Sequence, residues 1–136
     1  SGLCAGLGFS DADRSENLRR AAEAAKLGVT SRLCVVASFI TPLENQRERI
    51  RTILGRENVS LIYLSASIEV CRARDVKGLY AKASTGGVQQ MTGISSAFEP
   101  PAAVDLTLET SRDPVETCAG RLRDFAVQRL NLEARS

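Results

Sequence analysis

The sequence predicts an α/β fold built on a parallel sheet. Helix-forming segments alternate with short apolar runs, and this alternation is typical of strands joined by crossover helices. The first apolar run, residues 33–37, is apolar at every position, which favours a strand buried on both faces of a parallel sheet. With 136 residues, the chain has the size of one domain. We therefore expect a single α/β domain over residues 1–136.

The first half of the chain is expected to contain two helices and one strand. Ser10 is a favourable N-cap for a helix over residues 13–27. A strand at residues 33–37 and a charged helix at residues 44–54 follow, and Gly55 is expected to end that second helix. The apolar stripe of the first helix consists of Leu18, Ala21, Ala22 and Ala25.

The second half continues the alternation after a long polar interruption. We expect a strand at residues 59–64, a short helix at residues 68–74 and a third strand at residues 106–108. Residues 77–101 are rich in Gly, Ser, Thr and Gln, which predicts a lid or binding loop. Asp113 and Pro114 open a final amphipathic helix.

Composition excludes several classes of function. The net charge is only +2, from 18 basic and 16 acidic residues, so no global charge favours nucleic acid or a membrane surface. No apolar run is long enough to span a bilayer. The four cysteines stand apart and the chain contains no histidine, so no metal-ligand motif is present. We expect buried, reduced thiols in a cytoplasmic protein.

Three segments are expected near the carboxyl ends of the strands, where open α/β sheets bind ligands. They are the loop before Ser10, residues 38–42 and residues 74–80. The first combines an aromatic side chain with basic groups and an amide, which suits a flat base and anionic oxygens. The sequence therefore places a candidate binding site among these segments.

Five motifs in order resemble the adenylylsulfate kinases, which phosphorylate adenylyl sulfate (APS) with ATP. That family reads approximately L-G-F-S-x-x-D-R-x-E-N-x-R-R, S-F-I-S-P, R-D-x-K-G-L-Y-x-K-A, F-T-G-I-D and Y-E-x-P. One such motif is weak evidence, whereas five in order are strong. The corresponding residues here are LGFSDADRSENLRR at 7–20, SFITP at 38–42, RDVKGLYAKA at 74–83, MTGIS at 91–95 and FEPP at 98–101.

The resemblance implies a P-loop NTPase-like, three-layer α/β/α fold with a lid at about residues 77–101. The chain would form the C-terminal two-thirds or more of such a domain. It lacks the glycine-rich phosphate loop, which with its strand would lie upstream. That strand would pair beside residues 33–37, so we expect stable folding only when the upstream segment is present.

The implied reaction is transfer of the terminal phosphoryl group of ATP, with Mg²⁺, to the 3′-hydroxyl of APS. The product is 3′-phosphoadenylyl sulfate (PAPS), the activated sulfate of sulfate assimilation. The alternative is a catalytically inactive domain that binds APS or PAPS and regulates ATP sulfurylase. The resemblance further implies homo-oligomerisation. It is consistent both with a free-standing kinase and with one that is fused to or associated with an ATP sulfurylase, and the fragment alone would be inactive.

The resemblance assigns roles to individual residues. No catalytic or Mg²⁺-binding residue can be assigned, because the phosphate loop and an activating Asp would lie upstream. For ATP binding it implies Arg74 and Asp113, although Asp113 is equally consistent with a helix N-cap. For APS binding it implies Phe9, Arg14, Ser15, Glu16, Asn17, Ile40, Thr41, Lys77 and Met91. Without the motifs, Phe9 is interpreted as a buried loop residue and Arg14 as part of a solvated first helical turn.

The chain departs from the family pattern at four positions. Met91 stands where the family has the second phenylalanine of its adenine clamp, and a thioether lacks the geometry of ring stacking. Ser95 replaces Asp and Phe98 replaces Tyr, while Glu44 occupies a place where a basic or neutral residue is common. We therefore expect weaker or altered APS binding.

Overall fold

The computed structural model describes residues 2–8, 10–75, 78 and 97–131. By its internal contacts the chain divides into two compact units. Unit 1 consists of Ser1–Val59 and Leu79–Ala102, and unit 2 consists of Ser60–Gly78 and Ala103–Ser136. Parallel strands and helices are both present, so the predicted α/β class is confirmed.

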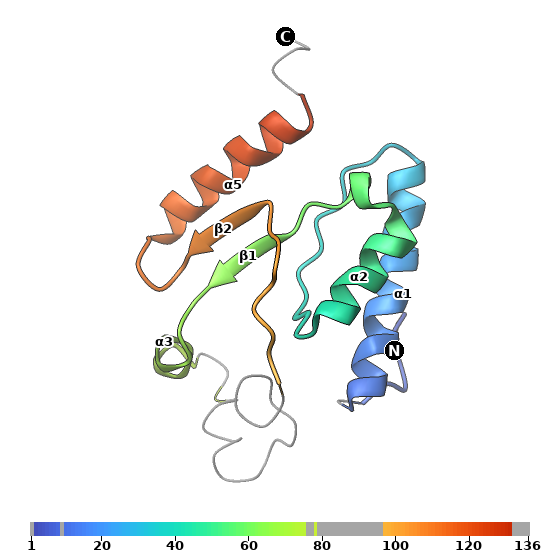
Figure 1. Ribbon diagram of the computed structural model, residues 1–136, viewed down its shortest axis with the longest axis horizontal. Coiled ribbons are helices and arrows are strands. Elements are labelled where there is room, and N and C mark those ends of the chain that lie inside the picture. The colour runs from blue at the N-terminus through green and yellow to red at the C-terminus, as the bar shows by residue number, and fades with distance from the viewer. Residues whose placement is uncertain (1, 9, 76–77, 79–96, 132–136) are drawn as a thin grey trace. The chain divides into compact units, whose positions relative to one another are not determined.

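Unit 1 is built on two helices that pack side by side, α1 (Asp11–Thr30) and α2 (Glu44–Leu54) (Figure 1). The Ser10 side chain accepts a hydrogen bond from the Asp13 backbone N–H at 3.1 Å, as expected of an N-cap. Leu18 and Ala22 are buried, which confirms the apolar stripe of the first helix. Gly55 follows α2 at a φ of +84°, a conformation that favours glycine.

Unit 2 contains a two-stranded parallel sheet, formed by β1 (Ile62–Ser65) and β2 (Leu106–Glu109) (Figure 1). Its register pairs Ile62 with Leu106 and Ser65 with Glu109. The short helix α3 (Ile68–Ala73) follows β1, and α5 (Val115–Arg129) packs on β2. The 3₁₀ turn η1 (Arg56–Asn58) follows α2 and belongs to unit 1.

One predicted strand is wrong. Residues 33–40 have no regular secondary structure and are exposed throughout, and Val36 exposes 88% of its surface. The described residues provide no backbone hydrogen bonds to residues 34–37, although the Leu33 N–H donates to Gly28 O. A strand exists only when another strand satisfies its backbone groups, so the apolar run remains extended and unpaired.

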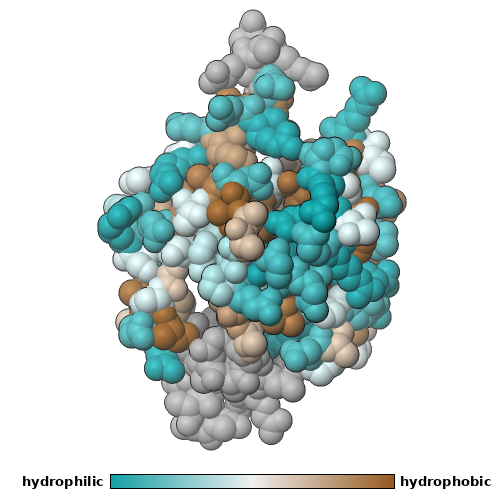
Figure 2. All heavy atoms as spheres, viewed as in Figure 1, coloured by the Kyte–Doolittle hydropathy of each residue, from teal (hydrophilic) through white to brown (hydrophobic). Residues whose placement is uncertain are grey.

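The cysteine prediction is only partly confirmed. All four cysteines are free, but only Cys118 is buried, whereas Cys34 is exposed with the apolar run that contains it. Helix α5 shows a similar excess of exposed apolar surface, since Val115 exposes 79% of its surface. On the face drawn in Figure 2, apolar residues lie among hydrophilic ones at the surface. None of the described helices is long and apolar enough to cross a membrane.

Candidate functional site

Helix α1 carries four of the predicted APS-binding residues in its first two turns. Arg14 and Asn17 are three positions apart, so the helix places them on adjacent turns of one face. Both are half-buried, and the Arg14 N–H donates to Ser10 O at 2.9 Å in the first turn. A guanidinium and a carboxamide on one face can bind an anionic oxygen and a hydroxyl together.

Ser15 and Glu16 are engaged in contacts within the protein. The Ser15 hydroxyl oxygen accepts a hydrogen bond from Gln46 Nε2 of α2 at 3.1 Å. Glu16 accepts hydrogen bonds from Arg19 at 2.7 and 2.8 Å and from Arg20 at 2.8 Å. These bonds from Arg19 and Arg20 lower the pKa of Glu16 to about 2, so its carboxylate is ionised at neutral pH. Glu16 therefore neutralises two arginines beside the predicted site.

Ile40 and Thr41 belong to the same unit. The Ile40 side chain is exposed, and the Thr41 carbonyl accepts a hydrogen bond from Arg47 Nη1 at 2.6 Å. This contact fixes the backbone at the place where the sequence predicts an edge facing the nucleotide. The predicted contacts Phe9, Lys77 and Met91 lie outside the described residues.

The two predicted ATP-binding residues converge on one loop of unit 2. Arg74 Nη2 donates to Thr110 O at 2.7 Å, directly after β2. Asp113 lies three residues further on and is half-buried. It accepts bonds from Arg112 at 2.9 Å and Arg121 at 3.4 Å, and the Arg112 bond is the main reason that its pKa is lowered. Asp113 is not the N-cap of α5, because Pro114 occupies that position.

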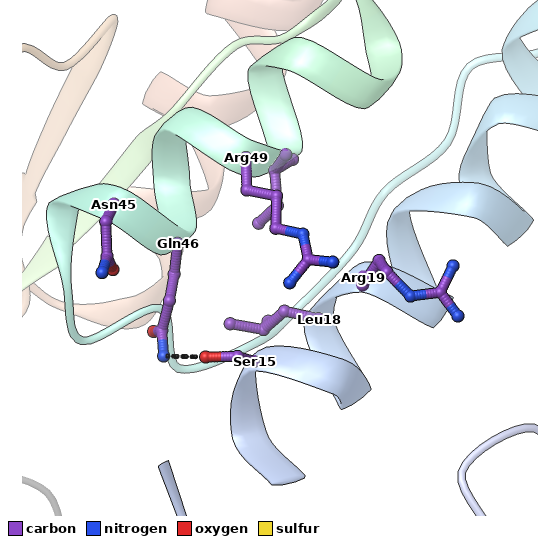
Figure 3. Close-up of a pocket in the computed structure, with 7 residues that line it drawn as sticks. Ser15, Leu18, Arg19, Asn45, Gln46 and Arg49 are labelled. Carbon is purple, nitrogen blue, oxygen red and sulfur yellow. Dashed lines mark hydrogen bonds between the residues drawn. The ribbon is translucent and has the colours of Figure 1, made fainter. Parts of the chain in front are cut away.

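A small cavity lies between α1 and α2. Its volume is about 120 Å³, well below the roughly 300–1,000 Å³ of typical ligand pockets, so it is too small for a nucleotide. Figure 3 shows the Gln46–Ser15 hydrogen bond at this cavity and Arg49 extending from α2 toward α1. Of the predicted APS contacts that the structure describes, only Ser15 lines it. The lining residues are Ser15, Leu18, Arg19, Asn45, Gln46, Arg49 and Ile50.

Sequence reasoning missed two buried polar residues of α2. Gln46 and Arg47 are only 4% and 3% exposed, in a helix whose sequence is mostly charged and polar. The Gln46 Oε1 atom is buried without a hydrogen-bond partner among the described residues. No local pattern distinguishes these two side chains from their exposed neighbours, because their burial depends on segments far away in the sequence. No group of three potential metal ligands gathers among the residues that the structure describes.

Comparisons with known proteins identify the family. A model of the adenylylsulphate kinase family matches residues 1–109. This chain belongs to the adenylylsulphate kinase family. A relative from Acaryochloris marina named adenylyl-sulfate kinase is 44% identical over 128 residues, which cover 94% of this chain and 62% of the relative. Another of that name, from Shewanella pealeana, is 45% identical over 134 residues, covering 97% of this chain and 65% of the relative.

The fold of a solved family member agrees. The Mycobacterium tuberculosis APS kinase CysC, in complex with AMPPNP and APS, matches with a TM-score of 0.81 and 35% identity. The match covers 92% of this chain and 73% of that one. The predicted P-loop NTPase-like fold class is therefore confirmed. The chain spans less than two-thirds of the length of the two curated relatives described above.

Proposed function

We propose that the longer protein, meaning this chain preceded by the remainder of a full-length family member, is an ATP-dependent adenylylsulfate kinase. It transfers the terminal phosphoryl group of ATP to the 3′-hydroxyl of APS and yields PAPS. The observation that carries this proposal is the family match over residues 1–109. The names of the curated relatives support it as well.

Unit 1 supplies the acceptor side in this proposal. The Arg14 guanidinium attracts the anionic oxygens of APS, and the Asn17 amide hydrogen-bonds to the sugar or the anion. The backbone at Ile40 and Thr41 lines the nucleotide, and Ser15 and Glu16 lie near it. Phe9 and Met91 are proposed to pack against the adenine, and Lys77, whose position in the sequence falls within unit 2, is proposed to bind the anion.

Unit 2 supplies part of the donor side. Arg74 and Asp113 approach the adenine of ATP, and the Arg74–Thr110 bond supports this because it ties Arg74 to the loop that carries Asp113. Mg²⁺ would neutralise phosphate charge when bound with ATP, and its ligands are proposed to precede this chain. Phosphoryl transfer depends mainly on positioning and charge neutralisation. Residues 1–136 by themselves are therefore proposed to be inactive.

The alternative is a regulatory domain that binds APS or PAPS without catalysis. The curated relatives are named as kinases, which favours the enzyme. A cytoplasmic location, a homo-oligomer and a fused or associated ATP sulfurylase remain part of the proposal.

The decisive measurement is ADP release by the longer protein with ATP, Mg²⁺ and APS. We expect turnover with APS and none above background with other nucleoside monophosphates. Binding of APS or PAPS without turnover supports the regulatory alternative instead, and turnover with a different acceptor contradicts the proposed substrate.

Arg14→Ala tests the acceptor side. Loss of a charge-assisted hydrogen bond worth about 1.5–3 kcal/mol raises the KM for APS by roughly ten- to a hundredfold. Lys26→Ala is the matched control, because Lys26 is an exposed cation near the other end of the same helix. Equal effects of the two variants contradict the assigned role of Arg14.

Met91→Phe tests the adenine clamp. The aromatic ring restores stacking on the base, which is worth about 1–3 kcal/mol in nucleic-acid complexes. We expect tighter APS binding by calorimetry, and no gain in affinity counts against Met91 as an adenine contact.

A further inference from the structure

Arg47 is the most deeply buried charged side chain among the described residues. It is 3% exposed, and arginine is almost never fully buried unless it is paired. Its Nε donates to Glu44 Oε2 at 2.8 Å, which balances its charge. Its Nη1 donates to Thr41 O and its Nη2 to Glu99 O, both at 2.6 Å. One guanidinium thus joins three chain positions, the most distant of which is 52 residues away.

Two further bonds hold Glu99 to the same place. The Glu99 N–H donates to Pro42 O at 2.8 Å. The Glu99 carboxylate accepts from the Glu44 N–H at 2.6 Å. Leu43 precedes α2 and provides no side-chain cap, so the distant Glu99 satisfies an N–H that the first turn of the helix leaves free. We call Arg47, Glu44 and Glu99 the α2 latch.

We infer that Arg47 is a positioning residue for the acceptor site. Through the α2 latch, Arg47 fixes the position of Thr41 relative to Glu99. Thr41 belongs to the proposed APS-binding edge, and Glu99 lies near the end of the polar stretch 77–101. This inference rests on the proposed function and deepens it.

The geometry explains why an arginine stands at this position. Its planar fork donates in three directions at once, whereas a lysine ammonium is a point charge that cannot reach two carbonyls and a carboxylate in the same arrangement. Without the fork, the Thr41 and Glu99 carbonyls lose their buried partner. Displacements of about 1 Å near a reaction centre can cost roughly a hundredfold in rate. A lysine at position 47 is therefore expected to loosen the acceptor edge while it keeps the charge.

Steady-state kinetics of the longer protein test this inference, with Arg47→Lys compared with Arg49→Lys. Arg49 lies on the same helix, is exposed and makes no hydrogen bond or ion pair with the described residues. We expect Arg47→Lys to raise the KM for APS about tenfold and to change the KM for ATP less than twofold, because the proposed ATP contacts belong to unit 2. Arg49→Lys is expected to leave both constants unchanged.

Other outcomes overturn the inference. A lower melting temperature with both KM values unchanged shows that Arg47 serves stability alone. Equal increases in the two KM values show that it does not act through the acceptor side. If Arg47→Lys fails to fold, Glu99→Gln tests the inference instead. This substitution removes the negative charge at the first turn of α2 and keeps the shape of the side chain. We expect it to raise the KM for APS about threefold, and an unchanged KM overturns the inference.

A measurement without nucleotide separates this inference from the proposed function. Hydrogen exchange of the Glu99 amide is expected to be at least tenfold faster in Arg47→Lys than in the wild type or in Arg49→Lys. Unchanged exchange overturns the latch even if the enzyme is active. A wild-type protein that transfers no phosphoryl group to APS overturns the proposed function, whereas faster exchange in Arg47→Lys still supports the latch.

Discussion

Two apolar runs of this chain have similar sequences and different structures. Residues 33–37 and β1 (Ile62–Ser65) are both short and rich in branched apolar side chains. β1 pairs in parallel with β2, whereas residues 33–37 are exposed and pair with no strand among the residues that the structure describes. A strand therefore depends on its neighbour as much as on its own composition.

The difference indicates that residues 33–37 require a partner strand that the described residues do not supply. Each exposed N–H and C=O group of an unpaired apolar strand favours pairing with another strand. The curated relatives are longer than this chain, and we propose that the residues preceding it supply the missing strand.

Removing the preceding residues is expected to have the largest effect. Apart from Pro42, the buried apolar residues among those described are Leu18, Ala22, Leu108 and Cys118, which is little buried apolar surface for a stable domain. Residues 1–136 alone are expected to show no cooperative unfolding transition in urea. The longer protein is expected to unfold cooperatively, with a free energy of unfolding of about 5 kcal/mol or more. Circular dichroism measures both. The control protein carries the preceding residues in scrambled order. Equal urea midpoints for residues 1–136 and for the longer protein contradict the prediction.

Shortening a buried side chain of the paired strand is expected to lower the free energy of unfolding more than shortening a side chain of the unpaired run. Leu108 of β2 is 2% exposed, so Leu108→Ala in the longer protein should lower the free energy of unfolding by about 2–5 kcal/mol. Val36→Ala should cost about 1–3 kcal/mol if the missing strand covers Val36. Urea denaturation measures both changes. A neutral Val36→Ala shows that the run stays uncovered and contradicts the proposed pairing.

Gly28→Ala tests whether the unpaired run is held against α1. A Cβ at Gly28 would lie 2.6 Å from Val35 Cγ2, so Val35 must move. In the longer protein we expect Gly28→Ala to lower the free energy of unfolding by about 1 kcal/mol, although alanine is favoured over glycine within helices. Gly120→Ala in α5 is the control, because the added Cβ would meet no described atom within 4 Å apart from its chain neighbours and the backbone of its own helix. Gly120→Ala should raise the free energy of unfolding by about 0.5–1 kcal/mol. An equal increase for Gly28→Ala shows that Val35 does not pack against Gly28.

The smallest effect concerns the surface of α1 rather than the strands. Because the pKa of Glu16 is lowered from 4.5 to about 2 by Arg19 and Arg20, its stabilising effect is present above about pH 4.5 and is lost as the pH falls toward 2. Glu16→Gln should therefore flatten the decline of the melting temperature over that range. Glu23→Gln, four residues from Arg19, is the control. A decline identical to that of the wild type in Glu16→Gln contradicts the prediction.

Much of the local structure could be predicted from the sequence. The predicted bounds of the helix at residues 44–54 match α2, and Ser10 and Gly55 flank α1 and α2 as expected. The boundaries of α1 and β1 differ from the prediction by one to three residues, as is common at frayed ends. The five motifs indicated the family before any fold was known, because motif residues are recognised one by one along the chain.

The long-range contacts of this chain could not be predicted from its sequence. The helices, the flanking residues Ser10 and Gly55 and the family could be predicted, since these depend on residues a few positions apart. The sequence could not determine that residues 33–37 remain without a partner or that Arg47 is enclosed by Thr41 and Glu99. The physical reason is that strand pairing and the burial of a charge depend on groups far away in the sequence, and no local pattern records where those groups lie.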